Sequence, residues 1–313
     1  MSRTRAFFCG FCLTAAVLVP LIGCILLLRQ TTVPPASQAD AEASGVPLAL
    51  PGPQDALTCL VIPSGEEDTG FLLVRMDAAA SRLAVLGLPP QTAVLSPEGG
   101  AVLLGEALAS AGPARAAELL TATLGLPIDY YLLASSSRLV DACTEFGAAS
   151  VNLAGFSVPE AQAQVGQAPV RTLLPSQVGQ ALAEWNLPAS QQAKLLAAVT
   201  AEFLSAAIRA NPSLPAEALR TLSSHMTSNM DGNDIALVER VCTFLSRSDA
   251  EACWDTLPGQ MQAGRFELES AAPDAAAELL GVNLPSKLEA AGSALPGTAG
   301  PASSSAARST AAG

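Results

Sequence analysis

An uninterrupted apolar segment near the amino terminus is the strongest hydrophobic feature of the chain. Residues 6–28 carry no charged side chain. These 23 residues would extend about 34 Å as a helix, enough to cross a hydrocarbon core of about 30 Å. Arg3 and Arg5 precede the segment, and only Arg29 follows it closely. This bias favours a cytoplasmic amino terminus, with the rest of the chain outside the cytoplasm. We therefore expect residues 1–29 to form an uncleaved, single-pass anchor in the cell membrane.

Two other interpretations of this segment stay open. A cleaved secretory signal has a shorter apolar stretch and a cleavage site of small residues, whereas here Ile25-Leu26-Leu27-Leu28 continues the apolar run. The sequence Leu21-Ile22-Gly23-Cys24 is loosely similar to a bacterial lipoprotein box, in which Cys24 would carry the lipid. Cleavage there would leave an apolar stub after the lipidated cysteine. The uncleaved anchor is therefore the preferred interpretation.

Low-complexity segments flank the rest of the chain. Residues 30–55 are rich in Pro, Ala, Ser, Gly and Thr, a composition typical of an extended linker. Residues 283–313 have an Ala/Ser/Gly/Pro composition without periodicity, and we expect a disordered tail there. A folded domain is therefore predicted for residues 56–282. This length can bury one substantial core.

Short apolar runs and amphipathic segments alternate in the first half of this domain. Apolar runs bounded by Pro, Gly, Ser and Asp predict buried strands at residues 57–62, 70–77, 82–88, 128–133 and 150–153. Helical spacing of apolar residues predicts a helix from Gly112-Pro113 to Leu124 and a second one at residues 135–146. Alternating helices and strands indicate a layered sheet with helices on its faces.

The second half of the domain is mostly helical by the same criterion. Pro188 opens a long helix with one apolar stripe, Pro215 begins another, and Asp231 or Asn233 caps a third. A short strand at residues 265–269 closes the domain. The predicted fold class is α/β with a helical second half.

Charge narrows the classes of function. The 313 residues include 16 Lys and Arg against 28 Asp and Glu, a net charge of −12. Such a chain lacks the cationic surface that neutralises nucleic-acid phosphates, so DNA and RNA are not expected partners. The sequence also carries no serine-nucleophile motif and no phosphate-binding glycine loop. Cys9 and Cys12 form a CxxC pair, but they lie within the apolar segment without a nearby His or Lys, so redox or metal chemistry is not expected of them.

Four cysteines fall within the predicted folded domain. Cys242 and Cys253 are eleven residues apart, and outside the cytoplasm a disulfide between them is chemically possible. Cys59, on a predicted strand, and Cys143, on the inward face of a predicted helix, are interpreted as buried thiols.

Several segments of the folded domain follow one another in a familiar order. Asp68-Thr69 precedes GFLLVRMD, and RLAVLGLP leads into Pro89-Pro90-Gln91-Thr92. LGLPIDYYLL, LVDACTEFG, TLPG and Asp274 come later in the chain. In this arrangement the chain resembles the LytR-CpsA-Psr family, over about residues 56–282. Members of that family are membrane-anchored extracytoplasmic proteins of bacterial envelopes, in agreement with the predicted anchor.

The resemblance implies an α/β/α sandwich with a mixed central sheet, whose apolar tunnel holds a polyprenyl-phosphate lipid. In the family, this domain transfers a glycopolymer phosphate from the lipid carrier to peptidoglycan. Acids hold Mg²⁺ there and arginines clamp the pyrophosphate, since phosphoryl transfer depends on charge neutralisation and positioning. Asp68 matches the family's acid and is the candidate catalytic and Mg²⁺-binding residue, with an N-cap or a solvated turn as its alternative role. Because Ala- and Leu-rich helices leave room for an isoprenoid chain, the expected tunnel lining includes Leu73, Leu119, Leu133, Leu196 and Phe203.

The sequence departs from the family where its arginines are expected. Glu66 stands two residues before the Asp-Thr pair in place of arginine. Pro89-Pro90-Gln91-Thr92 replaces Pro-Arg-Asp-Thr, and Ser190-Gln191-Gln192 replaces Arg-Gln-Gln. The arginine clamp of the family is therefore missing at every position that can be aligned.

Three functions are compatible with this pattern. The first is a degenerate, non-catalytic module that binds a lipid carrier or an envelope glycopolymer. The second is an active glycopolymer phosphotransferase that uses Mg²⁺ and takes its cations from unusual positions, such as Arg75, Arg115, Arg138 or Arg171. The third is a purely structural anchored domain. Arginines converging on Asp68 at the mouth of a tunnel would favour the second, a tunnel without arginines the first, and a filled core the third.

Overall fold

The computed structural model describes residues 50–65, 70–97, 99–156 and 169–283. The predicted anchor, nearly all of the predicted linker and tail, and Asp68 lie outside the described residues. None of the described helices combines the length and the apolar composition that a membrane span requires.

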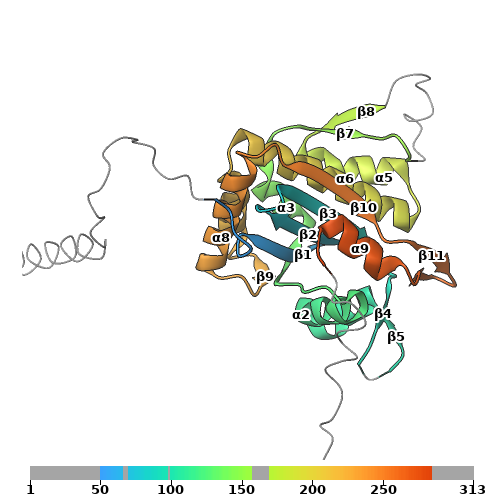
Figure 1. The fold of residues 1–313 in the computed structure, drawn as a ribbon. Coiled ribbons are helices and arrows are strands. Elements are labelled where there is room, and N and C mark those ends of the chain that lie inside the picture. Colours follow the sequence, from blue (N-terminus) through green and yellow to red (C-terminus); the bar gives the residue numbers. More distant parts are fainter. Residues whose placement is uncertain (1–49, 66–69, 98, 157–168, 284–313) are drawn as a thin grey trace, which may run out of the picture. The chain divides into compact units, whose positions relative to one another are not determined.

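A six-stranded mixed sheet organises the fold (Figure 1). Its strands, in spatial order, are β10 (Glu251–Thr256), β3 (Arg82–Leu88), β2 (Phe71–Asp77), β1 (Ala56–Ser64), β6 (Tyr130–Ser135) and β9 (Met226–Ser228). β1 pairs in parallel with β6, β10 pairs in parallel with β3, and β2 is antiparallel to both of its neighbours. The carboxyl ends of β1, β3 and β6 therefore lie at the same end of the sheet.

Three two-stranded antiparallel sheets surround the central one. They pair β4 (Ala93–Leu95) with β5 (Ala101–Leu103), β7 (Ala149–Asn152) with β8 (Val170–Leu173), and β11 (Gly259–Gln262) with β12 (Arg265–Leu268). The strand predicted at residues 150–153 is thus β7, outside the central sheet. The strand predicted at residues 265–269 is β12, and it does not close the domain because a helix follows it.

Helices cover both faces of the central sheet (Figure 1). α2 (Leu104–Leu124) and α9 (Ala272–Leu280) pack on one face. On the other lie α3 (Ser136–Ala142), α6 (Ala189–Ala210), α7 (Leu214–Leu222) and α8 (Gly232–Leu245). α5 (Val178–Trp185) packs with β7, β8 and α6 in a third cluster, next to the short 3₁₀ helices η1 (Thr144–Phe146) and η2 (Pro175–Gln177). The predicted α/β class, with a mixed central sheet and a helical second half, is confirmed.

Side chains of the strands alternate between these two faces, as the pleat of a strand requires. Leu60 of β1 and Leu73 of β2 are fully buried in the core on the α2 and α9 face. Their neighbours Cys59 and Leu72 belong to the core on the α6 and α8 face. The strands are buried on both faces, and this explains why they appear in the sequence as continuous apolar runs.

Local signals set the ends of several helices. Asp231 is the N-cap of α8, and its side chain accepts hydrogen bonds from the amides of Asn233 and Asp234. Gly125 ends α2 in the left-handed region, with φ of 67°. α2 begins at Leu104 and is interrupted at Gly112, where φ is 80° and ψ is −176°, so two helical segments meet there. The predicted start at Gly112-Pro113 matches the start of the second segment, and the first segment is not predicted. The Gly-Pro pair therefore marks a kink within the helix.

The sequence patterns do not predict two strands of the central sheet, β9 and β10, or two helices, α5 and α9. β9 is only three residues long and carries few apolar residues. β10 is an edge strand whose residues are mostly half-buried, so it lacks a clear apolar run. α9 follows β12 and begins with alanines and a proline.

The disulfide considered for Cys242 and Cys253 is not formed, since both are free thiols. Cys242 is buried on α8, with its Sγ 3.9 Å from Sδ of Met76. Cys253 is partly exposed on β10, and its Sγ accepts a hydrogen bond from Nε of Arg82 at 3.5 Å. The two thiols face different partners.

Candidate functional site

An apolar cavity of about 710 Å³ lies between the sheet and the helices on the α6 face. Leu57, Cys59 and Val61 of β1 and Leu72, Val74 and Met76 of β2 form its floor. Side chains from α3, α5, α6, α7 and α8 form most of the remaining wall, together with Leu132 of β6 and residues of the loops and 3₁₀ helices. The volume is within the range of about 300 to 1,000 Å³ that ligand pockets span.

Small residues on the covering helices leave this space open. Gly179 of α5, Ala193 of α6 and Ala218 of α7 all line the cavity, where larger side chains would fill it. At one point α6 comes very close to the sheet, because a Cβ built on Gly87 of β3 would lie 2.0 Å from the carbonyl oxygen of Ala193. This approach places the first turns of α6 over the carboxyl end of β3.

Polar side chains gather at the end of the cavity where the parallel strands terminate. Gly65 follows β1, Gln91 follows β3, and Ser136 and Ser137 follow β6. The register pairs Ser64 with Ser135, so β1 and β6 end at the same level. Gln192, from the first turn of α6, also lines the cavity. Sites in α/β proteins commonly lie outside the carboxyl ends of parallel strands.

The cavity wall carries very little charge. Among the described residues that line it, Asp141 is the one charged side chain, and none is arginine or lysine. The neutral polar residues of the wall are Gln91, Ser136, Ser137, Ser176, Gln192 and Thr200. Within the described part of the chain, Oε1 of Gln91 is buried without a hydrogen-bond partner. The described part of the wall can therefore solvate a neutral polar group but offers no Arg or Lys to an anion.

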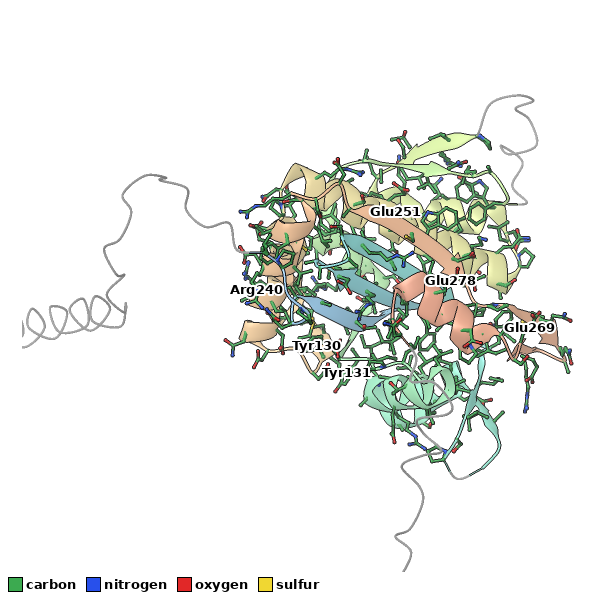
Figure 2. All side chains as sticks on the ribbon, viewed as in Figure 1. Tyr130, Tyr131, Arg240, Glu251, Glu269 and Glu278 are labelled. Atoms are coloured by element: carbon green, nitrogen blue, oxygen red, sulfur yellow. The ribbon has the colours of Figure 1, made fainter. Side chains whose placement is uncertain are left out.

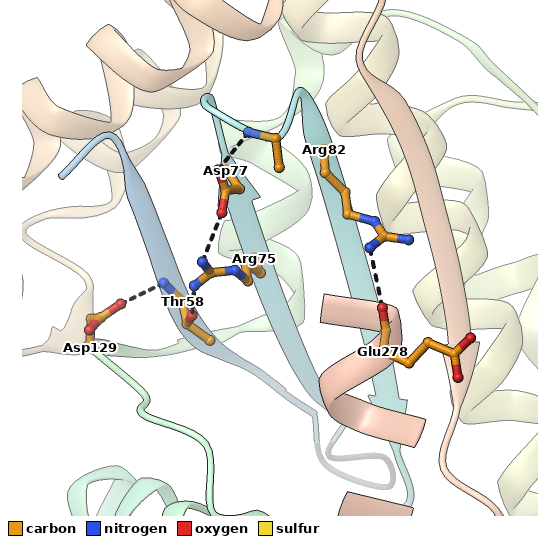
Figure 3. Close-up of polar contacts among 7 residues, drawn as sticks. Thr58, Arg75, Asp77, Arg82, Asp129 and Glu278 are labelled. Carbon is orange, nitrogen blue, oxygen red and sulfur yellow. Dashed lines mark hydrogen bonds and ion pairs between the residues drawn. The ribbon is translucent and has the colours of Figure 1, made fainter. Parts of the chain in front are cut away.

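Arg75 belongs to the opposite face of the sheet. Its Nη1 donates to Oγ1 of Thr58 at 3.0 Å, and its Nη2 pairs with Oδ2 of Asp77 at 2.8 Å (Figure 3). On the same face, Nη1 of Arg82 donates to the carbonyl oxygen of Glu278 in α9 (Figure 3). The alternation of side chains along β2 and β3 directs both arginines away from the cavity.

The other cations considered from the sequence are also held elsewhere or lie outside the wall. Arg115 pairs with Glu118 along α2 at 2.8 Å, and Arg171 of β8 pairs with Glu184 of α5 at 3.5 Å. Arg138 is exposed on α3 and is not among the residues that line the cavity. In the described structure, no two of these arginines meet at the cavity.

Three aromatic residues, Tyr130, Tyr131 and Trp185, pack in or against the core clusters and do not line the cavity. Trp185 is buried against β7 and β8, with the Arg171 guanidinium 4.9 Å from its ring centroid. Tyr131 packs against the core on the α2 face. Tyr130, labelled beside it in Figure 2, donates from its hydroxyl to Oδ1 of Asp234 at 2.8 Å. Burial and this carboxylate raise the pKa of Tyr130 to about 12.

The predicted lipid-contacting residues divide between two places. Leu196 and Phe203 of α6 line the cavity. Leu73, Leu119 and Leu133 lie instead in or against the core on the other face of the sheet, beside α2 and α9. Apolar runs do not tell which face a strand residue takes when both faces are buried, and only the tertiary arrangement places α2 opposite the cavity. The cavity-facing strand residues, such as Leu72 and Val74, are therefore the ones that sequence reasoning missed.

A buried thiol and a half-buried thiol belong to the cavity wall. Cys59 of β1 and Cys143, at the end of α3, both line it. Burial raises the pKa of Cys59 to about 12 and that of Cys143 to about 11. Both thiols are therefore protonated at neutral pH and contribute apolar surface to the wall.

The described residues do not fit a magnesium ion. Mg²⁺ prefers octahedral oxygen ligands that include carboxylates, and the cavity wall offers the single carboxylate of Asp141. No group of three His, Cys, Asp or Glu residues suited to a metal occurs within the described ranges. Asp68 lies outside those ranges, although Gly65 and Gly70 on either side of its segment line the cavity. The donor set of the described wall therefore supports no step through a metal.

Comparisons with known proteins rest on structure. No family model and no curated protein matches the chain. A candidate transcription regulator from Eubacterium siraeum has a TM-score of 0.62 at 15% identity, covering 80% of this chain and 100% of that one. TagV of B. subtilis has a TM-score of 0.53 at 14% identity, covering 73% and 98%. A structure of TagT bound to LIIa-WTA has a TM-score of 0.52 at 17% identity, covering 73% and 92%.

TagT and TagV are LytR-CpsA-Psr proteins. The chain has the LytR-CpsA-Psr fold. Its described residues form the same mixed α/β architecture over nearly the whole length of these solved chains. At 14 and 17% identity the likeness establishes the fold alone. The function of the domain therefore depends on the chemistry of its own cavity.

Proposed function

We propose that this chain is a membrane-anchored envelope protein whose LytR-CpsA-Psr-like domain binds the apolar chain of a lipid carrier without transferring its headgroup. The observation that carries the proposal is the cavity of about 710 Å³ with apolar walls and no arginine or lysine among its described lining residues. A structure of TagT bound to LIIa-WTA supports an envelope glycopolymer, or its lipid carrier, as the class of partner.

Binding of an isoprenoid chain follows from the chemistry of the wall. Each methylene group removed from water contributes about 0.8 kcal/mol, so a chain of several isoprene units has ample driving force. The floor residues Leu72 and Val74, together with Leu196 and Phe203 from α6, supply the apolar surface. A purely structural domain is disfavoured, because such a domain would fill its core to the density usual in protein interiors.

Active phosphoryl transfer is the less favoured function. In related chemistry, one arginine at the transferring phosphoryl group accounts for a factor of about 10³ to 10⁵ in rate. Arg75, Arg115 and Arg171 are paired with carboxylates away from the cavity. We therefore predict no hydrolysis of, or transfer from, a polyprenyl pyrophosphate by the purified protein with Mg²⁺, and no effect of Asp68→Ala. Turnover that depends on Asp68 would make the phosphotransferase the preferred function.

The location of the domain outside the cytoplasm is part of the proposal, and the apolar, uncharged segment 6–28 supports it. An impermeant thiol reagent should label Ser37→Cys in whole cells, in a background where the other exposed cysteines are replaced. Labelling only after lysis would contradict this topology. Three structural neighbours are described as established or candidate transcription regulators. Nucleic acid is nevertheless not the proposed partner, because the chain carries a net charge of −12.

Native mass spectrometry of the full chain, extracted in detergent, tests the proposed lipid binding. We expect an adduct with the mass of a polyprenyl lipid, retained by wild type and lost when Leu196→Trp fills the cavity. The matched control is Leu182→Met, which conserves the volume of another lining residue. Absence of any adduct, together with failure to bind added isoprenoid lipid, would contradict the proposed function.

A further inference from the structure

We infer that the cavity selects an isoprenoid lipid with a neutral, hydroxyl-type headgroup over the same chain carrying a phosphate. This inference rests on the proposed binding of an isoprenoid chain and narrows the ligand to a lipid that lacks the phosphate of a carrier. A phosphate monoester carries a charge of about −1.5 to −2 at neutral pH. The described residues of the wall offer it no arginine or lysine, and the one charged side chain they contain is the carboxylate of Asp141. An anion in this cavity would lose its water without gaining a cation.

The cations nearest in sequence to the polar end are not directed to it. Lys194 lies two residues beyond Gln192, but its Nζ pairs with Oδ1 of Asp255 at 2.7 Å. The same Nζ is 5.9 Å from the ring centroid of Trp254. Arg138 follows Ser137 on α3, where it is exposed and where Asp141 lies one turn further along the helix. Neither cation is among the described residues that line the cavity.

The first turn of α6 is the remaining source of positive potential, because Ala189 and Gln192 line the cavity there. Free amide groups at a helix start carry partial positive charge and donate hydrogen bonds. A hydroxyl oxygen can accept such a bond, and an ionised phosphate oxygen accepts a stronger, charge-assisted one. The partial charge of a single helix start, equivalent to about half an elementary charge, does not balance a doubly charged phosphate beside a carboxylate.

The polar residues at this end match a group that both donates and accepts. Gln91, Gln192, Ser136 and Ser137 each carry donor and acceptor atoms. A hydroxyl headgroup both donates and accepts, as these side chains do, whereas a fully ionised phosphate only accepts. The isoprenoid alcohol is therefore the better complement to this wall.

Competition binding with the full chain in detergent tests the inference. Geranylgeraniol and geranylgeranyl phosphate have the same isoprenoid chain and differ only in the headgroup. The concentrations at which each displaces a fluorescent isoprenoid probe therefore compare the two headgroups. We expect the alcohol to compete at least tenfold more strongly than the phosphate. Equal or stronger competition by the phosphate would overturn the inference and leave the proposed lipid binding intact. Failure of both compounds to compete would overturn both.

Charge-introducing variants give the matched controls. Gln91→Arg and, independently, Gln192→Arg place a cation at the polar end, and each should shift the preference towards the phosphate by at least tenfold. Ala109→Arg adds the same charge on an exposed position of α2, on the opposite face of the sheet, and should leave the preference unchanged. Circular dichroism verifies that the variants fold. If neither cavity variant that folds shifts the preference, the charge-based inference is wrong.

Discussion

Gly87 of β3 lies against the main chain of Ala193 in α6, so closely that a Cβ on Gly87 would be 2.0 Å from the Ala193 carbonyl oxygen. No backbone atom can approach a methyl group to that distance, so a side chain at Gly87 would push α6 away from the sheet. This contact holds the helix that provides much of the cavity wall, including Gln192 at its polar end.

We predict that Gly87→Ala destabilises the domain by about 1 to 3 kcal/mol, the range typical of overpacking. Urea unfolding followed by circular dichroism measures the change. Gly179→Ala is the control, because a Cβ there meets nothing within 4 Å and alanine favours the helical conformation of α5. Equal stability of wild type and Gly87→Ala would show that α6 adjusts freely.

Substitutions at Leu196 and Leu119 distinguish the role of the cavity in binding from the role of the opposite core in stability. Leu196→Trp should lower isoprenoid binding at least tenfold while changing stability little, because the added ring enters empty space. Leu119→Ala should do the reverse, with a loss of stability of about 2 to 5 kcal/mol from the opposite core and little change in binding at temperatures where it stays folded. If Leu119→Ala lost binding and Leu196→Trp kept it, the lipid would bind on the α2 face of the sheet, and the proposed site would be wrong.

Asp55 links the start of β1 to α8 and should make stability dependent on acid pH. Its Oδ2 accepts from the Gly52 amide, and its Oδ1 accepts from Nε of Arg240, each at 2.8 Å. The Gly52 amide, followed by Arg240, lowers the pKa of this carboxyl below its usual value. A carboxyl with a lowered folded-state pKa stabilises the fold above its unfolded pKa of about 3.9, and this contribution is lost as the pH falls through the folded-state value.

The free energy of unfolding should therefore decrease on acidification below about pH 4, with a smaller decrease in Asp55→Asn. Thermal unfolding between pH 3 and 7 measures this difference, with the two pH limits chosen at about one unit below and three units above the ordinary carboxyl pKa. Asp249→Asn changes an exposed carboxyl and should keep the wild-type dependence. An identical pH profile for Asp55→Asn would contradict the assignment.

The described cysteines should stay unpaired under oxidising conditions. Cys242 contacts Met76 and Cys253 contacts Arg82, so neither sulfur faces the other. Peptide mapping of the oxidised full chain should find no Cys242 to Cys253 bridge, and the double variant Cys242→Ala with Cys253→Ala should show the same response of its melting temperature to reductant as wild type. A linked peptide pair would contradict the structure.

The sequence alone determined the type and the approximate ends of several helices and strands. Gly and Pro residues bounding apolar runs predict β1, β2 and β3, and Asp231 predicts the start of α8 through its capping side chain. These signals act over a few neighbouring residues, and the local backbone responds to them in any tertiary setting. For the same reason the order of apolar runs and amphipathic segments was enough to predict the mixed α/β class.

Only the tertiary structure decided which residues surround the cavity. Leu72 and Leu73 are adjacent in an unbroken apolar run, yet Leu72 lines the cavity and Leu73 lies in the opposite core. Leu119 also lies in the opposite core, because α2 packs on that side of the sheet. Burial on both faces removes the alternation that would reveal a strand's orientation, and helix placement depends on contacts between residues far apart in the chain. The location of Arg75 away from the polar end has the same cause, since one step along a pleated strand reverses the direction of a side chain.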